Sequence, residues 1–413
     1  MTRDILIRDL PKEDIEWLDA NTPRGYSRTE LLRTLIAKQR EQGLPNPLVH
    51  SSATSTIAVA GVSPKFIDLF AGIGGFRIGM TAAGGSCVFT NEWDEPAQRT
   101  YTTWFGADDV HGGDIRSPEI INAIPDHDIL CAGFPCQPFS LAGVSKKKSL
   151  GRKHGFDDEK QGNLFFAITE VIDAHRPPVV LLENVKNLRS HDGGNTWTVI
   201  KSNLEQRGYA VFDQIIDANG WVPQHRERIF IVCFDEKVFG RKESIDFHFP
   251  KHPSGEKPVL GDILEKNPDR KYMLTDNLWA YLKAYREKHE RAGNGFGFSV
   301  FEPHQTTRTL SARYYKDGSE ILIAQKGWKN PRRLTPREAM KLMGFVDSYA
   351  ELFGHKSGFP LAVSDTQAYK QFGNAVVPGV VEAVGREIFK VIGKLYARSG
   401  TGCLLKGRNL KAA

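Results

Sequence analysis

The sequence has 413 residues, of which 40% are hydrophobic, and its 55 Lys and Arg residues exceed its 49 Asp and Glu residues by six. This length allows more than one domain with a large buried core, and the composition excludes a disordered chain, a coiled coil and a collagen-like fibre. No apolar run approaches the ~18 residues of a membrane helix, and the N-terminus lacks the apolar stretch of a secretory signal, so we expect a cytoplasmic protein.

Residues 1–45 predict a small separate unit. A short β-branched run at residues 5–8 precedes two helical patterns, the second of which begins with the capping pair Ser27 and Glu30. This strand–helix–helix order resembles a ribbon-helix-helix unit, in which two chains pair their strands and Arg8 would face outward toward DNA. Residues 1–20 carry a net charge of −3, however, so a DNA-binding unit and a dimerisation arm are both open.

Residues 46–64 are rich in Pro, Ser, Thr and Ala and predict a linker. Short apolar runs then alternate with helical patterns through residues 65–235, at residues 66–70, 128–131, 179–182 and 228–234. Such alternation is typical of a doubly wound α/β sheet. We therefore expect a Rossmann-like α/β domain over residues 65–235.

The alternation is lost over residues 236–331, where we expect a smaller and irregular second domain. Helical periodicity returns within residues 332–397, at 335–343 and 380–395, and residues 398–413 predict a loose basic tail. Residues 236–333 contain 19 basic and 13 acidic residues, so this segment alone equals the excess charge of the whole chain. A local positive excess favours an anionic partner for this segment.

Residues 66–79 read FIDLFAGIGGFRIG, an apolar strand that runs into glycines and then into a helical pattern. Such a turn lets a ligand approach the backbone at a helix N-terminus. A dinucleotide fingerprint starting at Gly72 would need glycine in place of Arg77, which disfavours a nicotinamide cofactor. Glu92 is placed to accept hydrogen bonds from ribose, and Trp93 could stack on adenine. The pattern suggests an adenosine-containing cofactor without pyrophosphate, and a turn that binds nothing is an equally open alternative.

The five cysteines are odd in number and none has C-x-x-C spacing, so we expect no disulfide framework and no metal site. Cys136 differs from the others because it follows an apolar strand and stands between Pro135 and Pro138, on a turn that displays it. This setting suits a nucleophilic thiolate.

Glu183 also ends an apolar strand, so its carboxylate would face the same crevice as a candidate acid or base. The alternative is a helix cap or a surface acid. Arg226 and Arg228 precede another strand, and their spacing places two guanidinium groups on one face of an extended segment. They suit phosphates or a carbonyl group.

In this order, residues 65–395 resemble the cytosine-C5 DNA methyltransferases over about four fifths of the chain. The matching segments are the turn at 70–75, Glu92-Trp93, Gly113-Asp114-Ile115, Pro135-Cys136-Gln137, Glu183-Asn184-Val185, Gln224-x-Arg226-x-Arg228, residues 333–338 and residues 373–378.

The resemblance implies a DNA (cytosine-5-)-methyltransferase that uses S-adenosyl-L-methionine and flips a cytosine out of double-stranded DNA. Its catalytic residues would be Cys136, which adds to C6, Glu183 near N3, Arg226 at the base carbonyl, and Arg228. Its cofactor contacts would be Phe70, Gly72, Gly74, Glu92, Trp93, Asp114, Ile115, Pro135, Leu164, Asn374 and Val376.

The same resemblance identifies residues 236–331 as a target-recognition domain whose segment 307–318 is similar to that of the Dcm- and EcoRII-type enzymes, which are directed to CCNGG. Arg308 and Arg313 would read bases, and Lys316 would contact a phosphate. Further DNA contacts are expected at Gln137 and Ser140 and in a basic loop that follows Cys136, at Lys146 and Lys147.

Two alternatives to this interpretation stay open, an RNA cytosine methyltransferase and a non-catalytic DNA-binding regulator. A homodimer through residues 1–45, regulation of its own operon and a cognate restriction endonuclease are further expectations.

Overall fold

The computed structural model describes residues 63–399 apart from 107–109, 135–163 and 294–296. The chain divides into a unit of residues 1–57, which lies outside the described residues, and a unit of residues 58–413. The expected ribbon-helix-helix unit, most of the linker and the basic tail therefore also lie outside them. The following description concerns the second unit alone.

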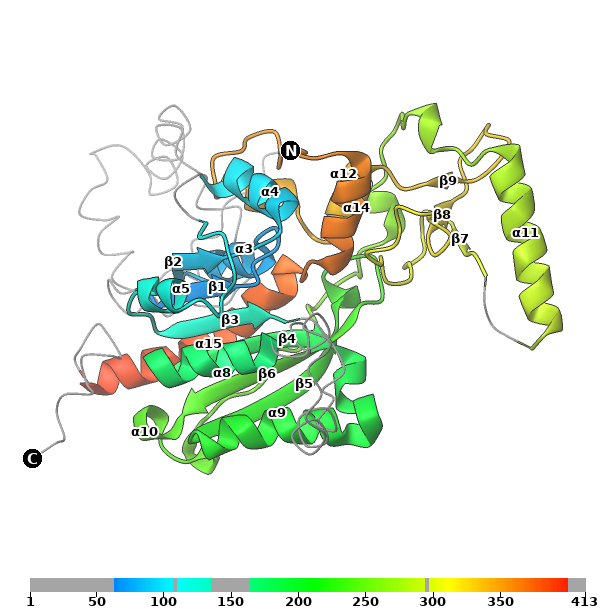
Figure 1. The fold of residues 1–413 in the computed structure, drawn as a ribbon. Helices are drawn as coiled ribbons and strands as arrows, with labels where there is room; N and C mark the ends of the chain where they lie inside the picture. Colours follow the sequence, from blue (N-terminus) through cyan, green and yellow to red (C-terminus); the bar gives the residue numbers. More distant parts are fainter. Residues whose placement is uncertain (1–62, 107–109, 135–163, 294–296, 400–413) are drawn as a thin grey trace, which may run out of the picture. The chain divides into compact units, whose positions relative to one another are not determined.

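A six-stranded sheet forms the centre of the second unit, with the strand order β2-β1-β3-β4-β6-β5 (Figure 1). Strands β1 to β4 run parallel to one another, whereas β6 is antiparallel to both of its neighbours. The strand bounds are β1 (Lys65–Leu69), β2 (Ser86–Asn91), β3 (Ile129–Gly133), β4 (Val179–Val185), β5 (Tyr209–Asp217) and β6 (Glu227–Asp235).

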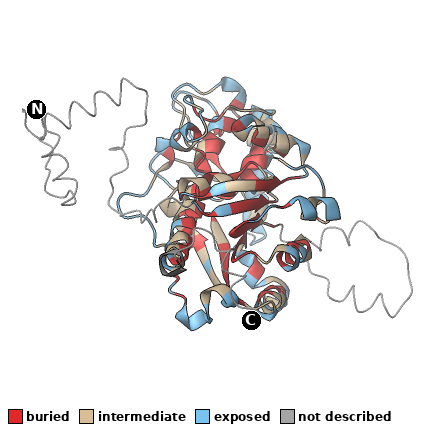
Figure 2. Ribbon diagram, turned by 90° about the vertical axis from the view of Figure 1, so that its left-hand side faces the viewer, coloured by how far each residue is buried: buried red, intermediate tan, exposed pale blue. Residues whose placement is uncertain are grey.

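Helices cover both faces of this sheet because successive strand residues point to opposite sides. Phe66 of β1 belongs to a core with α3 (Gly75–Ala82) and α15 (Pro378–Ser399), whereas its neighbour Ile67 belongs to a core with α8 (Leu164–His175) and α9 (Asn195–Gln206). Figure 2 shows the strands buried between these layers. The helices around the sheet are α3 (Gly75–Ala82), α4 (Glu95–Phe105), α5 (Pro118–Ala123), α8 (Leu164–His175), α9 (Asn195–Gln206), α10 (Glu236–Phe239) and α15 (Pro378–Ser399).

The last helix of the described residues, α15, returns to the sheet by packing closely on α3. A Cβ atom added to Gly79 would lie 2.6 Å from the carbonyl oxygen of Pro378 and 2.6 Å from Cβ of Val381. Glycine therefore allows α3 and α15 to approach more closely than larger side chains would. This contact fixes residues 373–377, which precede α15, beside the turn that follows β1.

A smaller lobe, defined here as residues 259–333, contains the three-stranded sheet β7 (Val300–Phe301), β8 (Leu322–Ile323) and β9 (Arg332–Arg333) and the helix α11 (Asp276–Arg291). In Figure 1 the β7–β9 sheet and α11 lie apart from the six-stranded sheet, with α12 (Pro336–Leu342) and α14 (Asp365–Asn374) between them. Helix α13 (Asp347–Glu351) lies in the chain between those two.

The predicted α/β sheet is confirmed, and the four predicted apolar runs form β1, β3, β4 and β6. The expectation of irregular structure up to Pro331 is wrong for α11, which has 16 residues and begins with Thr275 as its N-cap. Leu282 of this helix is buried and Leu278 and Trp279 are partly buried, so its helical pattern of apolar residues was overlooked among many polar ones. Among the described helices, none combines the length and apolarity that crossing a bilayer requires.

Asp68 is a buried acid inside the apolar run of β1. Its carboxylate is fully buried, and neither oxygen hydrogen-bonds another side chain in the described part of the chain. Burial raises its pKa to about 8, although the backbone N–H and the charge of Arg77 on α3 lower it. The other titratable groups that face it are Glu92, Tyr101, Cys87 and Cys131.

We predict that Asp68→Asn stabilises the fold, and increasingly so as the pH rises from about 4 to about 8. A carboxyl whose folded-state pKa is raised costs stability once it ionises, and the cost grows until the folded pKa is reached. The amide carries no charge, so the gain should be small at pH 4 and on the order of 5 kcal/mol at pH 8. Urea unfolding of both proteins across this pH range measures it; an equal difference at every pH would contradict the prediction.

Candidate active site

A cavity of about 790 Å³ lies at the edge of the sheet where β1, β3 and β4 end. Its walls come from the turn after β1, the residues after β2, the ends of β3 and β4, the start of β6 and the end of α14. The structure brings nine of the predicted site residues into these walls: Phe70, Gly72, Glu92, Trp93, Glu183, Arg226, Arg228, Asn374 and Val376.

The turn after β1 leaves its backbone open toward the cavity. Gly72 has φ +57°, a conformation that favours glycine, and no atom lies within 4 Å of the position that its Cβ would occupy. The carboxylate of Glu92 holds this turn, since Oε2 accepts the N–H of Gly72 at 2.7 Å and Oε1 accepts that of Asp94 at 2.8 Å. Burial raises the pKa of Glu92, and these two hydrogen bonds oppose the rise.

Trp93 is 67% exposed and lies in the cavity wall beside Glu92. An indole with a free face is suited to stacking on a flat heterocycle, and a neighbouring carboxylate has spare lone pairs for hydroxyl groups. The open backbone at Gly72, the acid and the exposed indole together fit an adenosine-containing cofactor.

The structure gives Gly74 a role in packing. This glycine has φ +84°, and a Cβ atom there would lie 2.4 Å from the ring of Phe105 on α4. Gly74 does not line the cavity. Glycine at this position therefore serves the packing of α4 on the turn.

Three further predicted cofactor contacts also lie away from the cavity walls. Asp114 forms an ion pair with Arg116, Ile115 is buried in the core, and Leu164 is the first residue of α8. A motif match gives the order of these residues along the chain, but it does not say where their side chains point.

Glu183 and Arg228 form a charged pair in the cavity wall. Nε of Arg228 lies 3.1 Å from Oε1 of Glu183, and both side chains are less than a fifth exposed. The pair exists because β6 is antiparallel to β4, which sets Val185 opposite Arg228. Burial raises the pKa of Glu183, while the charges of Arg228 and then Arg226 lower it. A carboxyl with a raised pKa can hold a proton near neutral pH.

Arg226 was expected to hold the base carbonyl. In the structure its guanidinium instead donates hydrogen bonds to backbone carbonyls. Nη1 donates to the carbonyl of Leu310 at 3.0 Å, and Nη2 donates to those of Gly373 at 2.9 Å and Ala375 at 2.8 Å. Burial lowers the pKa of Arg226 to about 9, so it still carries its charge at pH 7. Arg228 is thus the arginine of this pair that contacts Glu183.

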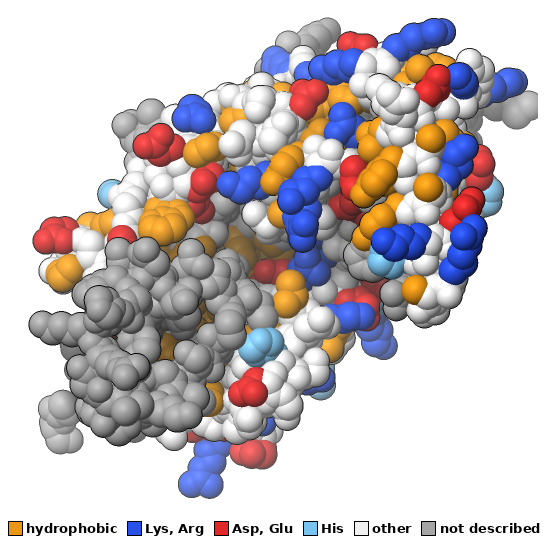
Figure 3. Space-filling view, turned by 45° about the vertical axis from the view of Figure 1, so that its right-hand side comes forward, with side chains coloured by type: hydrophobic (Ala, Val, Ile, Leu, Met, Phe, Trp, Pro, Cys, Tyr) orange, Lys and Arg blue, Asp and Glu red, His pale blue; other side chains and the backbone are white. Residues whose placement is uncertain are grey.

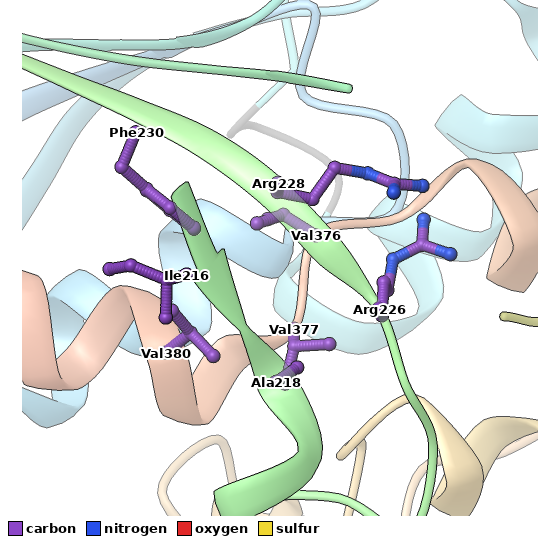
Figure 4. A pocket seen from close by; sticks show the side chains of 8 residues that line it. All are labelled: Ile216, Ala218, Arg226, Arg228, Phe230, Val376, Val377 and Val380. Carbon is purple, nitrogen blue, oxygen red and sulfur yellow. The ribbon is translucent and has the colours of Figure 1, made fainter. Parts of the chain in front are cut away.

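Figure 4 shows the guanidinium groups of Arg226 and Arg228 extending toward the same side, as their spacing predicted. Behind them, the side chains of Ile216, Phe230 and Val380 enclose a void of only about 10 Å³. The arginine stems therefore rest on tightly packed apolar side chains. Such packing limits the directions in which the two charged ends can move.

Asn184 links β4 to the segment that carries Cys136. Its Nδ2 donates to the carbonyl of Phe134 at 2.8 Å, and its Oδ1 accepts the N–H of Val185 at 2.8 Å. Phe134 lines the cavity two residues before Cys136. The predicted residues that lie outside the described ones are Cys136, Pro135, Gln137, Ser140, Lys146, Lys147 and Arg8.

The three predicted DNA contacts of the smaller lobe, Arg308, Arg313 and Lys316, are exposed. No ion pair to an acidic residue engages any of them among the described residues. Figure 3 shows Lys and Arg side chains gathered on one face of the molecule. These three side chains are therefore available to a polyanion.

The cavity also contains polar residues that the motifs did not indicate: Asp94, Asn187, His191, Lys370 and Gln371. Lys370 and Gln371 lie on α14, so an amphipathic pattern before Asn374 would have revealed them. His191 belongs to a short 3-10 turn, His191–Gly194, and its Nδ1 lies 2.7 Å from Oγ1 of Thr196. Such a turn has no sequence period that points to a cavity.

Comparison with known proteins identifies the family. Residues 64–390 match the C-5 cytosine-specific DNA methylase family. The chain is 45% identical over 372 residues to the DNA-cytosine methyltransferase of Escherichia coli (strain K12), covering 78% of this chain and 76% of that protein. It is 46% identical over 330 residues to the type II methyltransferase M.DsaV of Dactylococcopsis salina, covering 79% and 86%.

Solved structures show the same fold at lower sequence identity. The S. pombe Dnmt2 methyltransferase matches with a TM-score of 0.56 and 18% identity, over 82% of this chain and all of that one. The Entamoeba histolytica methyltransferase EhMeth matches with a TM-score of 0.60 and 18% identity, over 80% and 99%. From the family match and the identity to these curated relatives, the chain belongs to the C-5 cytosine-specific DNA methylases.

Proposed function

We propose that the cavity is where a cytosine, rotated out of duplex DNA, meets the catalytic groups Cys136, Glu183 and Arg228. The observation that carries this proposal is the buried pair of Glu183 and Arg228 in the wall that also contains Gly72, Glu92 and Trp93. A base inside a duplex cannot enter such a cavity, so the nucleotide must leave the stack first.

The cofactor of this methyltransferase is S-adenosylmethionine, which supplies an electrophilic methyl group when it is bound. Glu92 would accept hydrogen bonds from its ribose, and Trp93 would stack on its adenine. The backbone at Gly72 offers room for close approach, and Asn374 and Val376 line the same cavity.

The protein's own groups make C5 of cytosine reactive. The thiolate of Cys136 adds to C6 and forms a carbon–sulfur bond, which moves the ring electrons toward C5 and N3. Protonated Glu183 donates to N3, and Arg228 donates to the base carbonyl, so the developing negative charge is stabilised. After C5 has gained the methyl group, loss of its proton restores the C5–C6 double bond and expels the thiolate.

We predict that Cys136→Ser abolishes methyl transfer and leaves DNA binding intact. A serine hydroxyl is a far weaker nucleophile than a thiolate, so the single-turnover rate should fall by at least about 10³-fold. Transfer of labelled methyl groups to duplex DNA measures the rate, and a filter-binding assay measures affinity. Undiminished turnover in the variant would refute the assignment of Cys136, and labelling of tRNA in place of duplex DNA would favour an RNA substrate.

We propose a recognition sequence of the CC-x-GG type, read by Arg308 and Arg313, with a phosphate contact from Lys316. The support is the segment's resemblance to CCNGG-directed enzymes and the exposure of all three side chains. Bisulfite sequencing of DNA from cells that express the protein should show 5-methylcytosine in this context. Arg313→Ala should relax the preference at one base pair, and methylation outside the CC-x-GG context in the wild type would contradict the assignment.

We also propose that residues 1–45 form a ribbon-helix-helix unit that pairs two chains and binds the enzyme's own promoter. A cytoplasmic enzyme of a restriction–modification system, paired with an endonuclease, would need such control, and M.DsaV is named a type II methyltransferase. Footprinting with the full chain should protect the promoter, and a chain starting at residue 46 should not. If both chains give the same footprint, residues 1–45 are not the DNA-binding element, and sedimentation would then test dimerisation alone.

A further inference from the structure

A segment of the smaller lobe is hydrogen-bonded to the residues that directly precede β6. This reading segment, residues 307–313, begins with the buried Thr307 and contains the exposed Arg308 and Arg313. Thr307 donates its N–H to the carbonyl of Pro223 at 2.9 Å and accepts the N–H of His225 at 2.9 Å. Backbone pairing of this kind fixes the segment's position relative to the large sheet.

The side chains of Gln224 and Arg226, which directly precede β6, complete the attachment. Oε1 of Gln224 accepts the N–H of Leu310 at 3.1 Å, and Nε2 of Gln224 donates to the carbonyl of Leu342 at 2.7 Å. Arg226 then donates to the carbonyl of Leu310. The N–H and the carbonyl of Leu310 are thus each hydrogen-bonded by a buried polar side chain.

Arg226 also holds the wall of the cavity. Its Nη2 donates to the carbonyls of Gly373 and Ala375, and residues 373–376 all line the cavity. Arg226 is only 2% exposed, and no carboxylate hydrogen-bonds it among the described residues. One buried guanidinium therefore joins the reading segment to the cavity wall through backbone carbonyls alone.

The two backbones that Arg226 joins are in direct contact. A Cβ atom added to Gly373 would lie 2.3 Å from the nitrogen of Ala312 and 2.4 Å from the carbonyl carbon and oxygen of Ser311. Any side chain at position 373 would push the end of α14 away from the reading segment. A shift of the cavity wall is therefore transmitted to the reading segment without an intervening side chain.

We propose that Arg226 is a positioning residue that couples the cofactor cavity to sequence reading by Arg308 and Arg313 of the reading segment. This inference rests on the proposed function. A molecule that orders residues 373–376 orders the carbonyls that hold Arg226, and Arg226 orders Leu310 between Arg308 and Arg313. Because linkage is reciprocal, target DNA should tighten cofactor binding by the same factor.

Arginine is required for this role because its planar fork donates to three carbonyls in fixed directions. Arg226→Lys keeps the positive charge and most of the stem, but a lysine ammonium cannot reproduce that geometry. The matched control is Arg176→Lys. Arg176 also binds by a fork, donating to both carboxylate oxygens of Asp235 and to the carbonyl of Arg207, and it does not line the cavity.

The experiment measures the affinity of the full chain for CC-x-GG duplex and for a scrambled duplex, with and without S-adenosylhomocysteine. This molecule lacks the transferable methyl group, so no turnover occurs. In the wild type and Arg176→Lys, it should raise affinity for the target duplex by about tenfold and that for the scrambled duplex much less. In Arg226→Lys the enhancement should fall below about twofold. Enhancement that survives in Arg226→Lys would overturn the proposal.

Hydrogen–deuterium exchange on the wild type provides a test that does not depend on the variant's folding. S-adenosylhomocysteine alone should slow exchange in residues 373–376 and also in residues 307–313. Protection of 373–376 without protection of 307–313 would refute the coupling and leave the proposed function standing. Failure of S-adenosylhomocysteine to bind at all would instead refute the proposed function.

Discussion

The contact between Glu183 and Arg228 is the interaction on which the site depends. Glu183 lies near the end of β4, and Arg228 lies at the start of β6. The two meet because β6 runs antiparallel, so its beginning reaches the same edge of the sheet as the end of β4. Both side chains are less than a fifth exposed, so an unpaired charge at either would be costly. Pairing them lets the protein keep a protonatable carboxyl beside a fixed cation in the cavity.

Much of the fold could be predicted from the sequence because apolar runs and helical periods report burial directly. The runs that became β1, β3, β4 and β6 are of this kind. Strand direction was not predictable, since an apolar run reads the same in a parallel and an antiparallel strand. The run at 209–217 was missed because its second half alternates little in burial, and α11 was missed because most of its residues are polar or charged.

The site could be predicted where a motif fixes the backbone. It was less predictable where a side chain has several possible contact partners. Gly72 and Glu92 lie where the motif placed them, whereas the adjacent Gly74 packs on Phe105 instead. Spacing gave Arg226 and Arg228 the same face, but only the three-dimensional contacts show that one binds backbone carbonyls and the other binds Glu183. Asp68 escaped notice because a single acid in an apolar strand has no neighbouring polar pattern.

The most direct test of this account is a double-mutant cycle on the single-turnover methyl-transfer rate with Glu183→Gln and Arg228→Lys. If the pair acts as one unit, the double variant should be little slower than the slower single variant, with a coupling of roughly tenfold or more. If the two losses simply multiply, Glu183 and Arg228 act independently and the central claim is contradicted.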